Sequence, residues 1–181
     1  MEISEKNFEA IACPHLDAVY RAAYALCGDA SAAEDLVQTA YLKAFERFHT
    51  YREGSSCKAW LLTILRNTWI DRLRHSPSQE HMLGMDENLM GSAVETEEIT
   101  WTNADDLLEN FSDEMVIKAL HRLPPDLRLT LFLVDVEQYS HEQTAQIMAV
   151  AVGTIKSRTS RARNWLKKEL AQYAKDMGYK R

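Results

Sequence analysis

Residues 140–168, SHEQTAQIMAVAVGTIKSRTSRARNWLKK, contain two helical patterns separated by a short apolar turn. Ser140, followed three positions later by Gln143, fits a capping box and predicts the start of a short helix that continues to about Met148. A second helical pattern begins at about Val152. This order and spacing predict a helix-turn-helix, whose second helix can enter the major groove of DNA.

The second of these helices has an apolar face and a polar face when each residue is advanced by 100° around the axis. Its apolar face predicts contacts with a core and contains Ile155, Thr159, Ala162, Leu166 and Leu170. Serine, asparagine and arginine on the opposite side can form hydrogen bonds with base edges. The residues there are Ser157, Ser160, Arg161 and Asn164.

Basic residues surround that polar face. No acidic residue occurs between Val150 and Lys168. The basic residues in this interval are Lys156, Arg158, Arg161, Arg163, Lys167 and Lys168. So many positive charges on one helix favour an anionic partner, with a merely solvated basic face as the alternative.

Charge is distributed unevenly along the chain. Its 181 residues include 21 Lys and Arg and 27 Asp and Glu, a formal net charge of −6 that by itself argues against nucleic acid as a partner. By segment, residues 1–75 hold 9 basic and 10 acidic residues, residues 76–115 hold 0 and 11, and residues 116–181 hold 12 and 6. The acidic middle of the chain therefore conceals a basic C-terminal part.

This charge map and the helical periodicity predict three parts. We expect a first domain over residues 1–75, an acidic linker over 76–112 and a second domain over 113–181. Gly, Ser and Asn interrupt any helical period in the linker, which predicts a segment that is disordered or only locally helical. Strand-like alternation is almost absent, so the predicted fold class is all-α, with two small helical domains.

Two more helices are expected ahead of the helix-turn-helix. They cover residues 113–121 and 126–137, and the proline pair in 123–125 separates them. The apolar residues of the second helix include Leu127, Leu131 and Val134.

In the first domain, residues 33–48 form an amphipathic helical pattern. Its core face is predicted to contain Val37, Ala40, Tyr41, Ala44, Phe45 and Phe48. The polar side carries Asp35, Gln38, Thr39 and Glu46, with the single apolar residue Leu42 among them. A leucine surrounded by acid and amide groups is a candidate protein contact, although a lone exposed leucine without a role is equally compatible with the pattern.

Residues 58–75 form another amphipathic helical pattern. The apolar side contains Leu61, Leu62, Leu65, Trp69 and Leu73, and the polar side contains Thr63, Arg66, Asn67, Asp71 and Arg74. The polar side could contact phosphates or base edges, and Tyr51 and Trp60 could stack on unpaired bases. The alternative is a solvated amphipathic helix with core tryptophans.

Several function classes find no support in the sequence. Cys13, Cys27 and Cys57 show no CxxC spacing, so neither a disulfide framework nor a zinc site is expected. No phosphate-binding Gly-rich loop, HExxH or GxSxG motif occurs, so we expect no enzyme, no catalytic residue, no metal and no cofactor. We expect neither a membrane span nor a secretory signal, which favours a cytoplasmic protein without membrane insertion.

Several of these stretches resemble the bacterial sigma-70 superfamily in its extracytoplasmic-function (ECF) form. AEDLVQ (33–38), KAWLLTILRN (58–67) and IDRLR (70–74) are similar to region 2 of that family. LPPDLR (123–128), YSHE (139–142), GTIKSR (153–158) and RAR (161–163) are similar to its region 4. The stretches occur in the family's order, and a linker of suitable length separates the two groups.

The resemblance implies a transcription initiation factor that binds core RNA polymerase, directs it to promoters and assists DNA opening. It implies docking on the clamp helices of the largest subunit through Asp35, Gln38 and Leu42, contact with the flap region, and regulation by an anti-sigma factor. For the −10 element it implies contacts from Tyr51, Lys58, Trp60, Arg66, Asn67 and Arg74, with Asn67 at an unpaired base. For the −35 element it implies contacts from Thr154, Lys156, Ser157, Arg158, Ser160, Arg161, Arg163 and Lys167.

The sequence departs from the family pattern in two places. The turn 148–152 is more apolar and lacks a Gly or Pro that is often found there, and Ser160 is small. The alternative from another class is a stand-alone helix-turn-helix regulator that binds an operator as a dimer. A third interpretation is a helical module whose basic helix binds an acidic protein partner.

Overall fold

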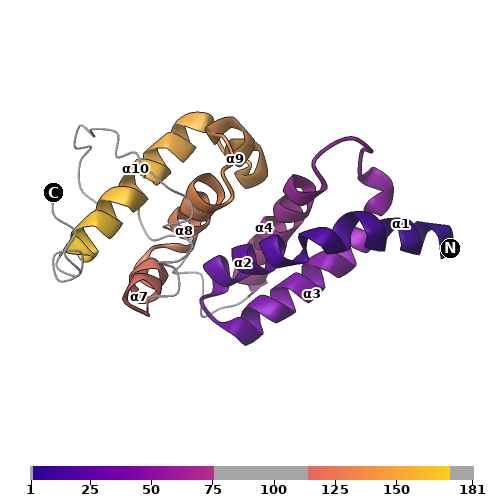
Figure 1. Ribbon diagram of the computed structural model, residues 1–181, viewed down its shortest axis with the longest axis horizontal. Helices are drawn as coiled ribbons and strands as arrows, with labels where there is room; N and C mark the ends of the chain where they lie inside the picture. The colour runs from indigo at the N-terminus through magenta and orange to yellow at the C-terminus, as the bar shows by residue number, and fades with distance from the viewer. Residues whose placement is uncertain (1, 76–113, 172–181) are drawn as a thin grey trace. The chain divides into compact units, whose positions relative to one another are not determined.

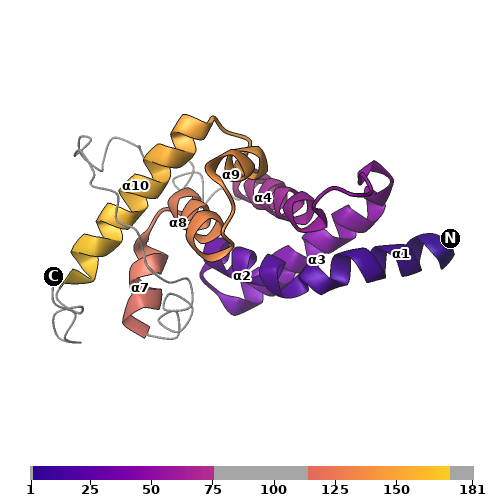
Figure 2. The ribbon, with the colours of Figure 1, turned by 45° about the horizontal axis from the view of Figure 1, so that its top comes forward.

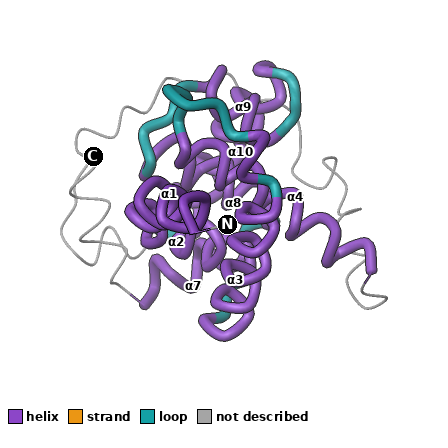
Figure 3. Tube along the Cα trace, turned by 90° about the vertical axis from the view of Figure 1, so that its right-hand side faces the viewer, coloured by secondary structure: helices purple, strands orange, loops and turns teal. Residues whose placement is uncertain are grey.

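The computed structural model describes residues 2–75 and 114–171, and the predicted linker over 76–112 lies outside these ranges. The chain divides into two compact units. The N-terminal unit contains the described residues up to 75, and the C-terminal unit contains most of those from 114 onward. Every regular element in the described residues is helical, which confirms the all-α prediction (Figure 1; Figure 3).

Four α-helices form the N-terminal unit. They are α1 (Glu2–Ala12), α2 (Leu16–Cys27), α3 (Ala30–Glu46) and α4 (Cys57–His75). A single 3-10 turn, Cys13–His15, joins α1 to α2, and the two helices run nearly in line (Figure 2). Helices α2, α3 and α4 pack against one another, and their buried residues include Val19, Leu26, Leu36, Leu61 and Leu65. The apolar side predicted for residues 58–75 is therefore confirmed as core.

The connection between α2 and α3 is only two residues long. Gly28 adopts a left-handed conformation with φ of 74°, and its N–H donates to the carbonyl oxygen of Tyr24 at 2.8 Å. Asp29 then caps α3, because its Oδ1 accepts a hydrogen bond from the N–H of Ala32 at 2.8 Å. Gly28 therefore ends α2, and Asp29, the next residue, begins α3.

Helices α3 and α4 are joined through a longer segment. A 3-10 turn, Phe48–Thr50, follows α3, and residues 51–56 then lead into α4. Ser56 starts α4, since its Oγ accepts from the N–H of Ala59 at 3.2 Å. Residues 51–56 are called the promoter loop below, after the contact with the −10 element that the resemblance implies for Tyr51.

The described residues from 114 onward form α7 (Glu114–Arg122), α8 (Pro125–Leu131), the π-helical segment η4 (Phe132–Val136), α9 (His141–Met148) and α10 (Val152–Glu169). The helix predicted over 126–137 is therefore interrupted, because its second half winds as a π-helix. One apolar cluster joins α7, α8 and α10 and consists of Ala119, Leu120, Leu123, Leu127, Leu131, Ala162 and Leu166, with Val116, Trp165 and Leu170 packed against it.

The predicted helix-turn-helix is present as α9 and α10. Both hydrogen bonds of the capping box form: the Oγ of Ser140 accepts from the N–H of Gln143 at 3.2 Å, and the Oε1 of Gln143 accepts from the N–H of Ser140 at 2.9 Å. The turn between the helices contains Ala149 in the left-handed region, with φ of 51°. Alanine therefore adopts the left-handed conformation at this turn, a conformation that glycine usually provides.

Candidate polymerase and nucleic-acid interfaces

Helix α3 presents one partly apolar face to solvent. Asp35 and Gln38 are exposed on it, and Leu42 is 60% exposed. Phe45 is 40% exposed, so its predicted place in the core is wrong. The 35, 38, 42, 45 spacing places these residues on one side of the helix. We call these four residues the α3 face.

Phe45 was misplaced because it lies at the edge of the core arc, next to Gln38 around the helix axis. Its ring meets the ring of Phe8 edge-on, with centroids 5.3 Å apart, and part of the ring remains in solvent. The angular position of Phe45 around the helix is compatible with either burial or exposure. The sequence pattern of α3 alone could not show that Phe8 of α1 covers one side of the Phe45 ring.

Polar contacts tie α3 to α4. The Nζ of Lys43 lies 3.2 Å from the Oδ2 of Asp71, and the Nη1 of Arg72 donates to the carbonyl oxygen of Ala32 at 3.3 Å. Both side chains of the ion pair are partly exposed, so it contributes less than about 1 kcal/mol. These contacts, together with the buried leucines, give the α3 face a defined position relative to α4.

The two aromatic residues predicted to stack on bases belong to an aromatic cluster. Tyr51 stacks on Phe48 with centroids 5.8 Å apart and planes 8° apart, and it tilts against Trp60 at 5.4 Å. The hydroxyl of Tyr51 donates to the carbonyl oxygen of Ser55 at 2.8 Å, which fixes the promoter loop to this ring. Tyr51 and Trp60 are half-buried, and their contacts with each other and with Phe48 hold both rings in place.

The polar side of α4 starts from this cluster. Asn67 and Arg74 are exposed, whereas Lys58 and Arg66 are half-buried. The Nη1 of Arg66 donates to the Oδ1 of Asn67 at 3.3 Å, which orients the amide group. An exposed amide held in this way can form hydrogen bonds with a base edge.

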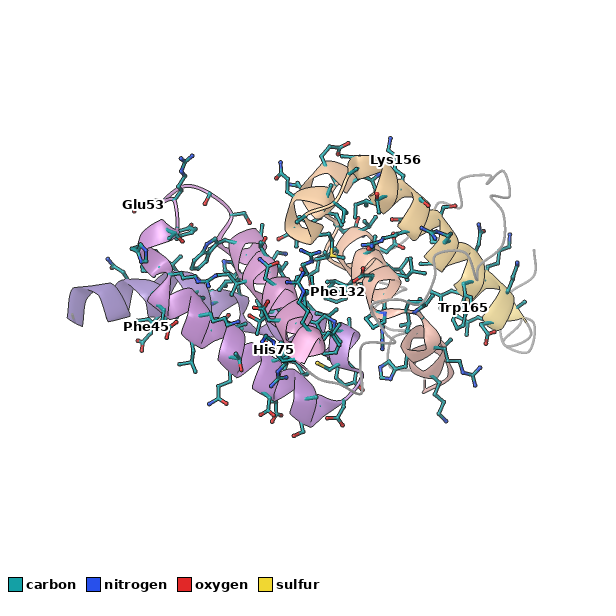
Figure 4. The ribbon with its side chains drawn as sticks, turned by 180° about the vertical axis from the view of Figure 1, so that it is seen from behind. Phe45, Glu53, His75, Phe132, Lys156 and Trp165 are labelled. Atoms are coloured by element: carbon teal, nitrogen blue, oxygen red, sulfur yellow. The ribbon has the colours of Figure 1, made fainter. Side chains whose placement is uncertain are left out.

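Helix α10 has the two faces that its sequence predicts. Ile155, Thr159, Ala162 and Leu166 are buried. Lys156, Ser157, Lys167 and Lys168 are exposed, and Thr154, Ser160, Arg161 and Asn164 are half-buried. In Figure 4, Lys156 points away from the body of the unit. This side of α10 can contact phosphates and base edges.

Two of the basic residues on α10 have acidic partners on other helices. The Nη2 of Arg158 lies 2.9 Å from the Oδ2 of Asp126, and the Nε of Arg163 donates to the Oδ2 of Asp135 at 3.2 Å. A second contact, from the Nη2 of Arg163 to the Oδ1 of Asp135, makes that pair bidentate. The sequence pattern did not indicate these two ion pairs, because a count of charges along one helix contains no information about acids on α8 and η4. DNA contact by Arg158 and Arg163 remains a prediction.

Protonation equilibria are shifted at a few sites. Burial, with the positive charge of Arg128 nearby, lowers the pKa of His121. Hydrogen bonds from its own backbone N–H and from Ser140 lower the pKa of Glu142. Burial raises the pKa of Cys57 and, strongly, that of Tyr41, whose hydroxyl donates to the carbonyl oxygen of Ala12 at 3.0 Å.

In residues 2–75 and 114–171, no three His, Cys, Asp or Glu side chains are grouped so that they could hold a metal ion. No helix in the same ranges is long and apolar enough to cross a membrane. The expectations of no metal, no cofactor and no catalytic activity remain predictions.

Both halves of the chain match known family models. Residues 14–77 match the model of sigma-70 region 2, and residues 113–166 match that of sigma-70 region 4. A stand-alone helix-turn-helix regulator would account for the second match but not for the first. The comparison thus favours an initiation factor over that alternative.

Individual proteins show the same relationship. The chain is 36% identical over 144 residues to the ECF RNA polymerase sigma factor EcfG of Rhodopseudomonas palustris, a match that covers 80% of this chain and 74% of the relative. It is 28% identical over 139 residues to the ECF RNA polymerase sigma-E factor of Haemophilus influenzae, covering 75% and 73%. Among solved structures, the sigma factor RpoE of Bartonella quintana, in complex with the anti-sigma factor NepR, is 32% identical with a TM-score of 0.68, covering 92% of this chain and 98% of that one. The chain belongs to the ECF group of the sigma-70 family and is a transcription initiation factor that binds core RNA polymerase and directs it to promoters.

Proposed function

We propose that three surfaces divide the work of initiation. The α3 face binds core RNA polymerase at the clamp helices of its largest subunit. The promoter loop and the polar side of α4 bind the −10 element, and the exposed side of α10 binds the −35 element.

The main support for the first assignment is the exposure of Leu42. Leu42 is 60% exposed, more than Leu16 at 45% or Phe45 at 40%, and it lies between polar groups on a helix whose other side is core. An apolar side chain within a polar rim is the usual centre of a protein contact. Phe45 extends this apolar centre along the helix.

The assignment of the −10 element rests on the aromatic cluster and on Asn67. The half-buried rings of Tyr51 and Trp60 offer a surface on which bases can stack. The exposed amide of Asn67, on the same helix as Trp60, can form hydrogen bonds with a base edge. The assignment of the −35 element rests on α10, whose exposed side carries lysines, serines and Arg161.

A protein partner of the anti-sigma class fits the same exposed surfaces. The related structure from Bartonella quintana contains such a partner. An anti-sigma factor that covers the α3 face would compete directly with core polymerase. We also place the protein in the cytoplasm, where the polymerase lies, and assign it no enzymatic activity of its own.

Replacement of Leu42 by Ala tests the polymerase contact. We expect core polymerase to bind the variant at least about fivefold more weakly, because loss of a buried interface anchor costs more than about 1 kcal/mol. Binding is measured by fluorescence anisotropy of the labelled chain. The matched control is Leu16→Ala, since Leu16 is also an exposed leucine of this unit at 45% but lies on α2. Equal affinity of both variants for core polymerase would refute the assignment.

A further inference from the structure

A single ring from α1 lies at the centre of the aromatic residues of the N-terminal unit. Phe8 is buried and meets three other rings edge-on: Phe45 and Phe48 at 5.3 Å and Tyr41 at 6.3 Å, with interplanar angles between 79° and 87°. Phe8 precedes residues 14–77, which match the region 2 model. Its position is therefore a feature that the family comparison does not assign.

Phe8 is connected to the promoter loop through Phe48. The ring of Phe48 stacks on Tyr51 at 5.8 Å and lies 6.4 Å from Trp60, and Tyr51 in turn lies 5.4 Å from Trp60. Phe8 of α1 is therefore two ring contacts away from Tyr51 and two from Trp60, the residues that we expect to stack on bases.

The promoter loop depends on this cluster for its position. Residues 52–56 are all exposed, and most of their hydrogen bonds are made within the loop, as between Ser55 and Arg52. Tyr51 is the half-buried residue of the loop, and its hydroxyl holds the carbonyl of Ser55. The Tyr51 ring therefore restrains the loop at Ser55, in addition to the anchor that Ser56 provides at the start of α4.

We propose that Phe8 is a positioning residue for promoter opening. Its ring holds Phe48, and through Phe48 it holds Tyr51 and Trp60 where an unpaired base of the −10 element is received. The same ring supports Phe45 from the inside of the α3 face, so one residue of α1 supports both the polymerase-binding surface and the strand-binding surface. This inference rests on the proposed function of the promoter loop.

The test uses Phe8→Leu, which keeps an apolar side chain but removes the ring, and Phe8→Tyr, which keeps the ring. Each variant is assembled with core polymerase on promoter DNA, and opening of the −10 region is measured by permanganate reactivity at saturating holoenzyme. We expect Phe8→Leu to reduce opening about ten- to a hundredfold, because a small displacement of the base-stacking rings can cost that much activity. We expect Phe8→Tyr to open DNA as the wild type does.

A control separates positioning from general destabilisation. Leu26→Ala alters a fully buried residue of α2 that is not part of the aromatic cluster. At a temperature where both variants are folded, Leu26→Ala should leave opening unchanged. The 19F resonance of fluorotryptophan at position 60, assigned by its loss in Trp60→Phe, should move in Phe8→Leu and stay in place in Leu26→Ala.

Two outcomes overturn different claims. If Tyr51→Ala and Asn67→Ala reduce opening but Phe8→Leu does not, the inference about Phe8 is wrong and the proposed function of the loop stands. If Tyr51→Ala and Asn67→Ala also leave opening unchanged, the proposed function of the loop fails and the inference fails with it.

Discussion

At the scale of single residues, Ala149 shows a backbone conformation that its side chain does not favour. Its φ of 51° lies in the left-handed region, where a residue with a Cβ atom costs about 1–2 kcal/mol relative to glycine. The sequence pointed to this turn as unusual because it lacks a glycine. The structure shows that the turn keeps the left-handed geometry nevertheless.

Ala149→Gly should therefore stabilise the helix-turn-helix of α9 and α10 by about 1 kcal/mol, since glycine relieves the strain of the positive φ. Hydrogen exchange of the α9 and α10 amides measures this change within the two helices themselves. Ala145→Gly is the control, because Ala145 lies in α9 with helical geometry. It should destabilise the helix-turn-helix by about 1 kcal/mol, and protection that changes equally in both variants would contradict the explanation.

His121 gives a second prediction at this scale. Its pKa is lowered in the folded protein, so the unfolded chain binds a proton more readily as the pH falls below the ordinary value of 6.5. The contribution of His121 to stability is complete above that value and decreases as the pH falls toward the folded pKa.

The wild type should therefore lose more stability than His121→Gln between about pH 8 and about pH 5. The free energy of unfolding of both proteins, measured by urea denaturation across this range, checks the difference. Parallel pH profiles for the two proteins would show that His121 does not contribute.

At the scale of elements, α10 is held by acids from other helices as well as by its apolar face. The carboxylate of Asp135 is buried and bidentate with Arg163, whereas that of Asp126 is about half exposed beside Arg158. Burial makes the first pair sensitive to the loss of either partner, while solvent weakens the second.

Asp135→Asn should destabilise the C-terminal unit by about 1–3 kcal/mol, because it leaves a partly buried guanidinium without its counter-charge. Asp126→Asn is the matched control and should cost less than about 1 kcal/mol. Denaturant unfolding of both variants, with Arg163→Ala and the double variant to complete a cycle, measures the coupling. Equal losses in the two aspartate variants would contradict the difference in burial.

The elements also show which features a sequence can predict. The buried face of α10 and the capping box of α9 depend on residues a few positions apart, and the sequence predicts both correctly. The Asp135–Arg163 pair and the contact of Phe8 with Phe45 join residues far apart in the chain, so no local pattern contains them. The π-helical segment was missed for a different reason, because its apolar residues are equally compatible with an ordinary α-helix.

At the scale of the whole molecule, the proposed surfaces are distributed over two separate units. The α3 face and the promoter loop belong to one, and α10 belongs to the other. The acidic linker that we expect over 76–112 lies outside the described residues. We therefore expect changes in one unit to alter one activity and to leave the other intact.

Variants of α10 test this separation. Arg161→Ala should reduce binding to promoter DNA by about 1–3 kcal/mol with little effect on random DNA, whereas Lys167→Ala should weaken binding to both and reduce the salt dependence by about one ion. Both variants should bind core polymerase as the wild type does. Gel-shift titrations at several salt concentrations supply the measurement. Equal loss on promoter and random DNA in Arg161→Ala would exclude base contact there.

The buried cysteine at the start of α4 provides an internal reporter of motion. Cys57 follows the promoter loop directly, and burial both shields its sulfur and raises its pKa, whereas Cys13 is exposed. An alkylating reagent therefore reaches Cys13 in the resting protein but must wait for a local opening before it reaches Cys57. The rate of Cys57 alkylation, with and without polymerase bound, reports how often this part of the protein opens, and no label has to be introduced.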